Sequence, residues 1–266
     1  MLKNLPGVTK NLLYINVIIF LGAFIILPML GGPPFQKVVE GLGLFYFDSP
    51  LFMPHQLVTH MFMHGGIFHI FINMFMLAMF GSLLERMWGP KRFFIYYFFT
   101  GFGALILHQV VQGVHLQQTL GSIAFSPWDL GEVCRDCCSR LSQCSNQIGG
   151  SVQEQISKPC SKVPPKEFIH KYCSAHRTYI TPTVGASGAV FGLLVAFGYL
   201  FPNTELMFLL IPVPIKAKYL IPVLILFELF FGIRGGTNIA HFAHLGGAIF
   251  GFLLLKYWQR DRGSFY

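Results

Sequence analysis

Charged residues are scarce in this chain of 266 residues. Asp, Glu, Lys and Arg together make up 11% of it, whereas about 25% is usual for a soluble domain. Hydrophobic residues make up 53%, and there are 3 tryptophans against 29 phenylalanines. So little charge at such a high apolar content excludes an ordinary soluble globular protein and indicates a membrane protein.

Signatures of several other protein classes are also missing. The sequence has no H-E-x-x-H metalloprotease motif and no run of alternating basic and aromatic residues typical of RNA binding. The first apolar run lacks an A-x-A-like cleavage site, so we expect a retained span and not a signal peptide. The net charge of +8 is typical of basic residues beside membrane spans, and no nucleic-acid partner is expected.

Apolar runs near the roughly 20 residues that a helix needs to cross a bilayer recur along the chain. They predict six spans, at about 11–30, 57–84, 93–111, 185–201, 217–233 and 239–258. Lys and Arg of the short loops fall mostly on one side of these spans, which predicts cytoplasmic N- and C-termini. We therefore expect an integral multi-pass protein, and we expect it in a bacterial inner membrane.

A segment of different composition separates the third and fourth predicted spans. Residues 115–182 hold all six cysteines, which are Cys134, Cys137, Cys138, Cys144, Cys160 and Cys173. The predicted topology puts this segment outside, where disulfides persist, so disulfides or unpaired thiols are favoured over a metal site. The sequence thus predicts spans one to three in 1–114, a cysteine-containing outer loop insertion in 115–182, and spans four to six in 183–260.

A serine among small residues opens the fourth predicted span. Ser187 lies in T-V-G-A-S-G-A-V-F-G, from Thr183 to Gly192. One interpretation is helix packing, because Gly188 and Gly192 form a small-xxx-small pair that lets two helices approach closely. The other is a nucleophile with room around its hydroxyl group.

Histidines in the neighbouring spans favour the second interpretation. Polar groups within spans are costly and are functional candidates by default. The second and sixth spans carry a set of them on the same predicted side as Ser187, comprising Thr59, His60, His64, His69, Asn73, Asn238, His241 and His244. Such convergence on one side of the membrane predicts a reaction centre there.

Glycine spacing predicts which histidine meets the serine. His244, Gly247 and Gly251 share one helix face, as do Gly188 and Gly192 in the fourth span. Two such faces allow close contact, which would set His244 beside Ser187 as its general base. We expect no carboxylate in the outer half of any span, so the sequence predicts a Ser-His dyad.

Donors for an oxyanion are also available. His69 and Asn73 are one helical turn apart, and the Ser187 backbone N–H is free at a helix start. All three could stabilise an acyl-transfer transition state. We expect structural roles for His60 and His64 and a paired structural role for Glu228. His241 is the alternative base, although only His244 has the glycine spacing.

These motifs together resemble those of the rhomboid intramembrane serine proteases. G-A-S-G from Gly185 to Gly188 resembles the family's nucleophile motif. A-H-L-G-G around His244 with the later Gly251 resembles the final-helix motif, and H-I-F-I-N from His69 to Asn73 resembles the oxyanion pair. G-S-L-L-E, ending at Glu85, resembles a G-x-x-x-E motif whose carboxylate is structural.

The resemblance implies an all-α membrane protein, a six-helix bundle around a short, recessed fourth helix. It implies cleavage of single-span membrane proteins in or near their transmembrane segments, without a cofactor or metal. Three features depart from the family pattern, which are the pair His55-Gln56 in the first outer loop, Phe191 in place of a tyrosine, and the cysteine segment. The main alternative is a catalytically silent rhomboid-like module that binds membrane proteins; a transporter is disfavoured because no inverted repeat is found.

Overall fold

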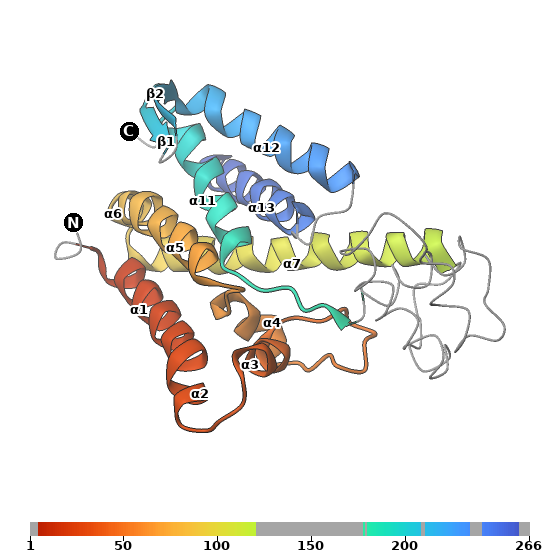
Figure 1. The fold of residues 1–266 in the computed structure, drawn as a ribbon. Helices are drawn as coiled ribbons and strands as arrows, with labels where there is room; N and C mark the ends of the chain where they lie inside the picture. Colours follow the sequence, from red (N-terminus) through yellow and green to blue (C-terminus); the bar gives the residue numbers. More distant parts are fainter. Residues whose placement is uncertain (1–4, 121–177, 179, 209–210, 235–240, 261–266) are drawn as a thin grey trace. The chain divides into compact units, whose positions relative to one another are not determined.

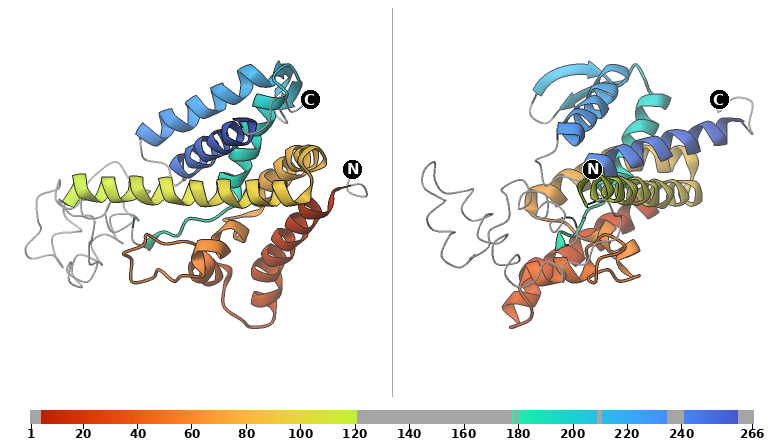
Figure 2. Two further views of the ribbon diagram at one scale, coloured as in Figure 1. Left: turned by 180° about the vertical axis from the view of Figure 1, so that it is seen from behind. Right: turned by 90° about the vertical axis from the view of Figure 1, so that its right-hand side faces the viewer.

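The computed structural model describes residues 5–120, 178, 180–208, 211–234 and 241–260 (Figures 1 and 2). The chain divides into two compact units. One comprises Met1–Leu44, Met53–Val111 and Pro182–Tyr266, and the other Phe45–Phe52 and Gln112–Thr181. The candidate site lies entirely in the first unit, while the predicted boundaries of the insertion stay a prediction. All six cysteines lie outside the described residues.

The N-terminal part begins with an apolar helical segment, Gly7–Met29. It consists of α1 (Gly7–Leu21), a π-helical turn η2 (Gly22–Ile26) and α2 (Leu27–Met29), and α3 (Phe35–Leu42) follows after a turn. The second apolar segment, Ile67–Trp88, consists of α5 (Ile67–Met76), the π-helical η4 (Leu77–Gly81) and α6 (Ser82–Trp88).

The predicted second span, 57–84, is wrong at its start. The chain first forms two short turns, α4 (Gln56–Thr59) and the 3₁₀ turn η3 (His60–Phe62), before the helix begins at Ile67. Gly66 is extended, with φ 166° and ψ 174°, and directly precedes the helix. His60 and His64 therefore precede the membrane-spanning helix.

Four further helices and a hairpin complete the described fold. They are α7 (Pro90–Leu120), α11 (Ser187–Leu200), β1 (Glu205–Phe208), β2 (Ile211–Lys216), α12 (Ala217–Arg234) and α13 (His241–Arg260). The α7 helix, at 31 residues, exceeds the predicted span 93–111. The two strands pair antiparallel, with Glu205 opposite Lys216, between the fourth and fifth predicted spans.

The protein is mostly helical, with one small hairpin in its described part. Three described helical segments are long and apolar enough to cross a membrane, which are Gly7–Met29, Ile67–Trp88 and Pro90–Gln118. The apolar helix α11 is shorter, at 14 residues. Six spans and a recessed fourth helix therefore stay predictions.

Close packing of α11 against α13 is confirmed. A Cβ placed on Gly247 would overlap the carbonyl oxygen of Gly188, and one on Gly251 would lie 3.1 Å from the Cα of Gly192. The two helices lie beside each other in Figure 1, with α11 in teal and α13 in dark blue. Their backbones meet because glycine leaves no side chain between them.

Glu85 has the structural role that its motif predicts. Its carboxylate accepts hydrogen bonds from the backbone N–H groups of Val8 (2.8 Å) and Thr9 (2.7 Å), and from the Thr9 hydroxyl group (2.8 Å). The first N–H groups of a helix lack intrahelical partners. Glu85 thus caps α1 and joins it to α6.

Candidate active site

The segment before α11 is held in place on both sides. Thr183 pairs with Leu44 through two backbone hydrogen bonds, of 2.7 and 2.9 Å, and the Gly185 N–H donates to the carbonyl oxygen of His60 at 2.9 Å. Gly185 has φ 124°, a conformation that side chains disfavour. A Cβ at this position would also lie 2.8 Å from the His69 ring. Glycine is therefore required at position 185. Two residues later, Ser187 is the first residue of α11.

Ser187 and His244 are in contact. The Oγ of Ser187 lies 2.8 Å from Nε2 of His244. This distance is within hydrogen-bonding reach for transfer of the hydroxyl proton to the ring. The structure thus brings together the two residues that glycine spacing predicted to meet, while their catalytic roles stay a prediction.

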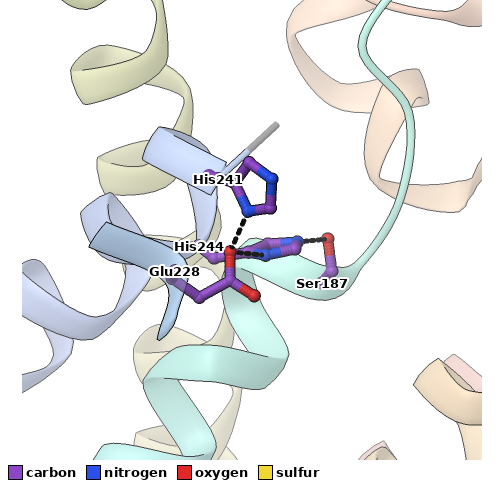
Figure 3. Close-up of polar contacts among 4 residues, drawn as sticks. All are labelled: Ser187, Glu228, His241 and His244. Atoms are coloured by element: carbon purple, nitrogen blue, oxygen red, sulfur yellow. Dashed lines mark hydrogen bonds and ion pairs between the residues drawn. The ribbon is translucent and has the colours of Figure 1, made fainter. Parts of the chain in front are cut away.

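A carboxylate lies on the other side of the same imidazole ring. The Oε2 of Glu228, from α12, is 2.9 Å from Nδ1 of His244 and 2.6 Å from Nδ1 of His241. Figure 3 shows Glu228 between the two histidines, with Ser187 beyond His244. The expectation that no carboxylate would be available here is wrong. Glu228 follows Ala217 by eleven positions in a helix of 18 residues, so it lies in the half that ends at Arg234.

Phe191 lies against the face of the His244 ring. Their ring centroids are 4.4 Å apart, and the planes are nearly parallel, at 6°. Phe191 is one turn after Ser187 on α11, so serine, phenylalanine and histidine meet on one face. Phe191 therefore stacks on the His244 ring without offering a hydroxyl group.

His69 presents one ring nitrogen toward the serine segment. The Gly65 N–H donates to its Nδ1 at 3.2 Å, so Nδ1 accepts and the ring proton is on Nε2. That Nε2 is the atom that a Cβ on Gly185 would approach to 2.8 Å. His69 therefore has a donor beside the segment that carries Ser187.

Asn73 is held by its own helix. Its side-chain N–H donates to the carbonyl oxygen of His69 at 2.9 Å, and the residue is 3% exposed. An amide nitrogen has two hydrogens, so one donor remains beyond this bond. The contact steadies Asn73 one turn from His69.

A small cavity adjoins Ser187. Its volume is about 20 Å³, and its lining includes His60, His108, Thr183 and Ser187. A void of roughly 10–15 Å³ can hold one water molecule when polar groups surround it. His108 contacts Thr183 there through Nε2 and Oγ1, 2.8 Å apart. The cavity can thus hold a water molecule beside Ser187.

His60 and His64 are buried in the segment before α5. The Nδ1 of His60 donates to the carbonyl oxygen of Gln56 at 2.8 Å, and burial lowers the pKa of His60 to about 4. Burial, with the neighbouring His69 adding to it, lowers the pKa of His64 to about 3. Both rings are therefore neutral at pH 7, which fits the structural roles predicted for them.

A comparison with known protein families shows which family the chain belongs to. The Rhomboid domain model matches residues 52–124 and 166–260. This chain belongs to the rhomboid family. With its apolar helices, this rhomboid protein is an integral membrane protein.

Two similar proteins cover a smaller part of the rhomboid chain. RHOMBOID-like protein 6, mitochondrial, of Arabidopsis thaliana is 36% identical over 81 residues, which is 30% of this chain and 23% of that protein. Rhomboid protein 1, mitochondrial, of Saccharomyces cerevisiae is 35% identical over 83 residues, with the same shares. The matches span about a quarter of each relative. Both names place those proteins in mitochondria, whereas the expected bacterial inner membrane stays a prediction for this one.

The histidine pair and the carboxylate are also the described residues best placed to hold a cation. Ligand atoms of Glu228, His241 and His244 all lie within 4.8 Å of one another. The sequence predicts neither a metal nor a cofactor, and a paired structural role for Glu228. Counting positions along the helix from Ala217 would have placed Glu228 in the half that ends at Arg234. Asn238, one of the polar residues predicted on the same side as Ser187, lies outside the described residues.

Proposed function

We propose that this rhomboid protein is an intramembrane serine endopeptidase. The observation that carries the proposal is the contact of 2.8 Å between Ser187 Oγ and His244 Nε2. A serine hydroxyl is a weak nucleophile until a neighbouring base removes its proton. His69 and Asn73 support the proposal because both have N–H donors in the same part of the protein.

The proposed reaction has two stages. Ser187 Oγ attacks the carbonyl carbon of the substrate peptide, its proton passes to His244 Nε2, and the oxyanion is stabilised by His69, Asn73 and the Ser187 backbone N–H. The C–N bond then breaks, and His244 gives the proton to the leaving amine. Water next attacks the acyl-serine ester, again through His244, which releases the carboxylic acid and restores the serine.

The proposed substrates are single-span membrane proteins that reach Ser187 from the lipid bilayer. The resemblance implies small side chains at the cut and helix-destabilising residues nearby. A helical peptide bond has to unwind before a nucleophile can reach it, so such residues lower the cost of exposing it. Six spans with both termini on the cytoplasmic side complete the proposal.

Cleavage of a single-span substrate in liposomes tests the proposal. The wild-type protein should yield a product, whereas Ser187→Ala and His244→Ala should reduce the rate by about 10⁴-fold or more, because loss of either member disables a serine centre. His241→Ala should leave a measurable rate. Retention of the folded monomer in detergent by Ser187→Ala is the control.

Three outcomes would contradict parts of this proposal. A folded wild-type protein that cleaves no substrate would favour the catalytically silent binding module. Product formation by Ser187→Ala would exclude the assigned nucleophile. Loss of activity in His241→Ala but not in His244→Ala would move the base to His241.

A further inference from the structure

The carboxylate of Glu228 contacts the histidine that faces Ser187, and the sequence did not predict this contact. Its Oε2 lies 2.9 Å from Nδ1 of His244, while Nε2 of the same ring lies 2.8 Å from Ser187 Oγ. Serine, histidine and glutamate thus follow one another in the order of a hydrolase triad. We propose that Glu228 is a positioning residue that holds His244 in the tautomer needed for catalysis, so that this rhomboid protein works with a triad. The inference rests on the proposed protease function.

The tautomer of His244 decides whether the ring can act as a base. Nε2 can accept the serine proton only when it has none, and a neutral ring then has its proton on Nδ1. Glu228 Oε2 faces Nδ1 and accepts only, so it favours that tautomer. When the ring takes the serine proton, the carboxylate also stabilises the imidazolium ion.

Burial strengthens the electrostatic effect of the Glu228 carboxylate on His244. The Glu228 side chain is 17% exposed and that of His244 12%. A carboxylate shielded from water is costly unless it is paired and hydrogen-bonded, and electrostatic effects on its neighbours are stronger there than in water. A charge at this place therefore acts on the His244 ring more than an exposed one would.

His241 anchors the carboxylate. Its Nδ1 donates to the same oxygen, Oε2, at 2.6 Å, and its side chain is 8% exposed. The approach of Oε2 to His244 is more oblique, an ion-pair contact and not an aligned hydrogen bond. His241 therefore fixes where the carboxylate lies, and Glu228 in turn acts on His244.

Two variants separate positioning from a merely structural pairing. Glu228→Gln removes the charge beside His244, whereas His241→Gln removes the imidazole next to Glu228, keeps a side-chain N–H that can donate to Oε2, and leaves the charge of Glu228 unchanged. Loss of the acid from soluble triads lowers kcat by about 10⁴-fold. Because the contact here is oblique, we expect Glu228→Gln to lower kcat by about 100-fold with KM unchanged, and His241→Gln to lower it by less than about tenfold.

A double variant tests whether Glu228 acts through His244. Glu228→Gln should cause no further loss in a His244→Ala background, because residues that act as one unit are not additive. Glu205→Gln, at an exposed carboxylate of the hairpin, is the matched control and should keep the wild-type rate. The rate at which a fluorophosphonate labels Ser187 provides a second readout, which needs no peptide substrate.

The outcomes distinguish this inference from the proposed function. Absence of both cleavage and labelling in the wild-type protein would overturn the protease itself. Wild-type cleavage with an unchanged kcat in Glu228→Gln would overturn only the triad, as would equal losses in Glu228→Gln and His241→Gln. A wild-type rate that responds to Zn²⁺ or to a chelator, when that of Glu228→Gln does not, would make the cluster a cation site and overturn the positioning role.

Discussion

Substitution of Gly247 by alanine tests the packing that brings His244 to Ser187. The added methyl group would overlap the carbonyl oxygen of Gly188. A backbone atom cannot rotate away as a flexible side chain can, so α13 and α11 would have to separate. His244 lies one turn before Gly247, and Ser187 lies directly before Gly188. Separating the two helices would therefore move His244 away from Ser187.

Two quantities should change in this variant. Overpacking of a tight contact costs about 1–3 kcal/mol of unfolding free energy, which should lower Tm in detergent. A shift of about 1 Å at a reacting pair can cost about 100-fold in rate, so kcat/KM for a single-span substrate in liposomes should fall by that order. The loss in rate should exceed the loss expected from the unfolded fraction at the assay temperature.

Gly22→Ala is the matched control, because a Cβ at Gly22 would meet nothing within 4 Å. It adds the same methyl group to a helical glycine of the first apolar segment and should change neither Tm nor kcat/KM. Wild-type rate and Tm in Gly247→Ala would refute the reasoning, since the helices would then not be in contact at this glycine.

Two further predictions concern stability. Glu85→Gln removes the charged acceptor of three donors from Val8 and Thr9, so the unfolding free energy should fall by about 2–3 kcal/mol; an unchanged Tm in detergent would contradict the capping role. The pKa of His60 is lowered from 6.5 to about 4, so the buried ring stays neutral where an unfolded one would be protonated. Its contribution to the free energy of unfolding is fully present above pH 6.5 and is lost as the pH falls toward 4; at pH 5 the free energy of unfolding is lower by about 2 kcal/mol. The slope of Tm between pH 7 and pH 5 should flatten in His60→Asn and persist in His55→Gln, an exposed ring; equal slopes in both variants would exclude His60 as the source.

The amino-acid sequence by itself determined the membrane class and the main partners in the candidate site. Scarce charge and long apolar runs indicate membrane helices, because charged groups are costly in hydrocarbon. The spacing of Gly188, Gly192, Gly247 and Gly251 predicted the contact between α11 and α13, since helical periodicity places these glycines on single faces. It therefore also predicted that Ser187 and His244 meet.

Only the tertiary structure decided the other contacts of the site. The periodicity of α12 says which of its residues share a face, but the neighbour of each face depends on how three helices pack. Glu228 reaches His244 and His241 only because α12 packs beside α13. In the same way, the hydrogen bond from Gly65 that places the His69 proton on Nε2 depends on the extended turn at Gly66. Contacts between segments distant in sequence depend on how the helices pack, and a local sequence pattern does not say which distant segment a helix face will meet.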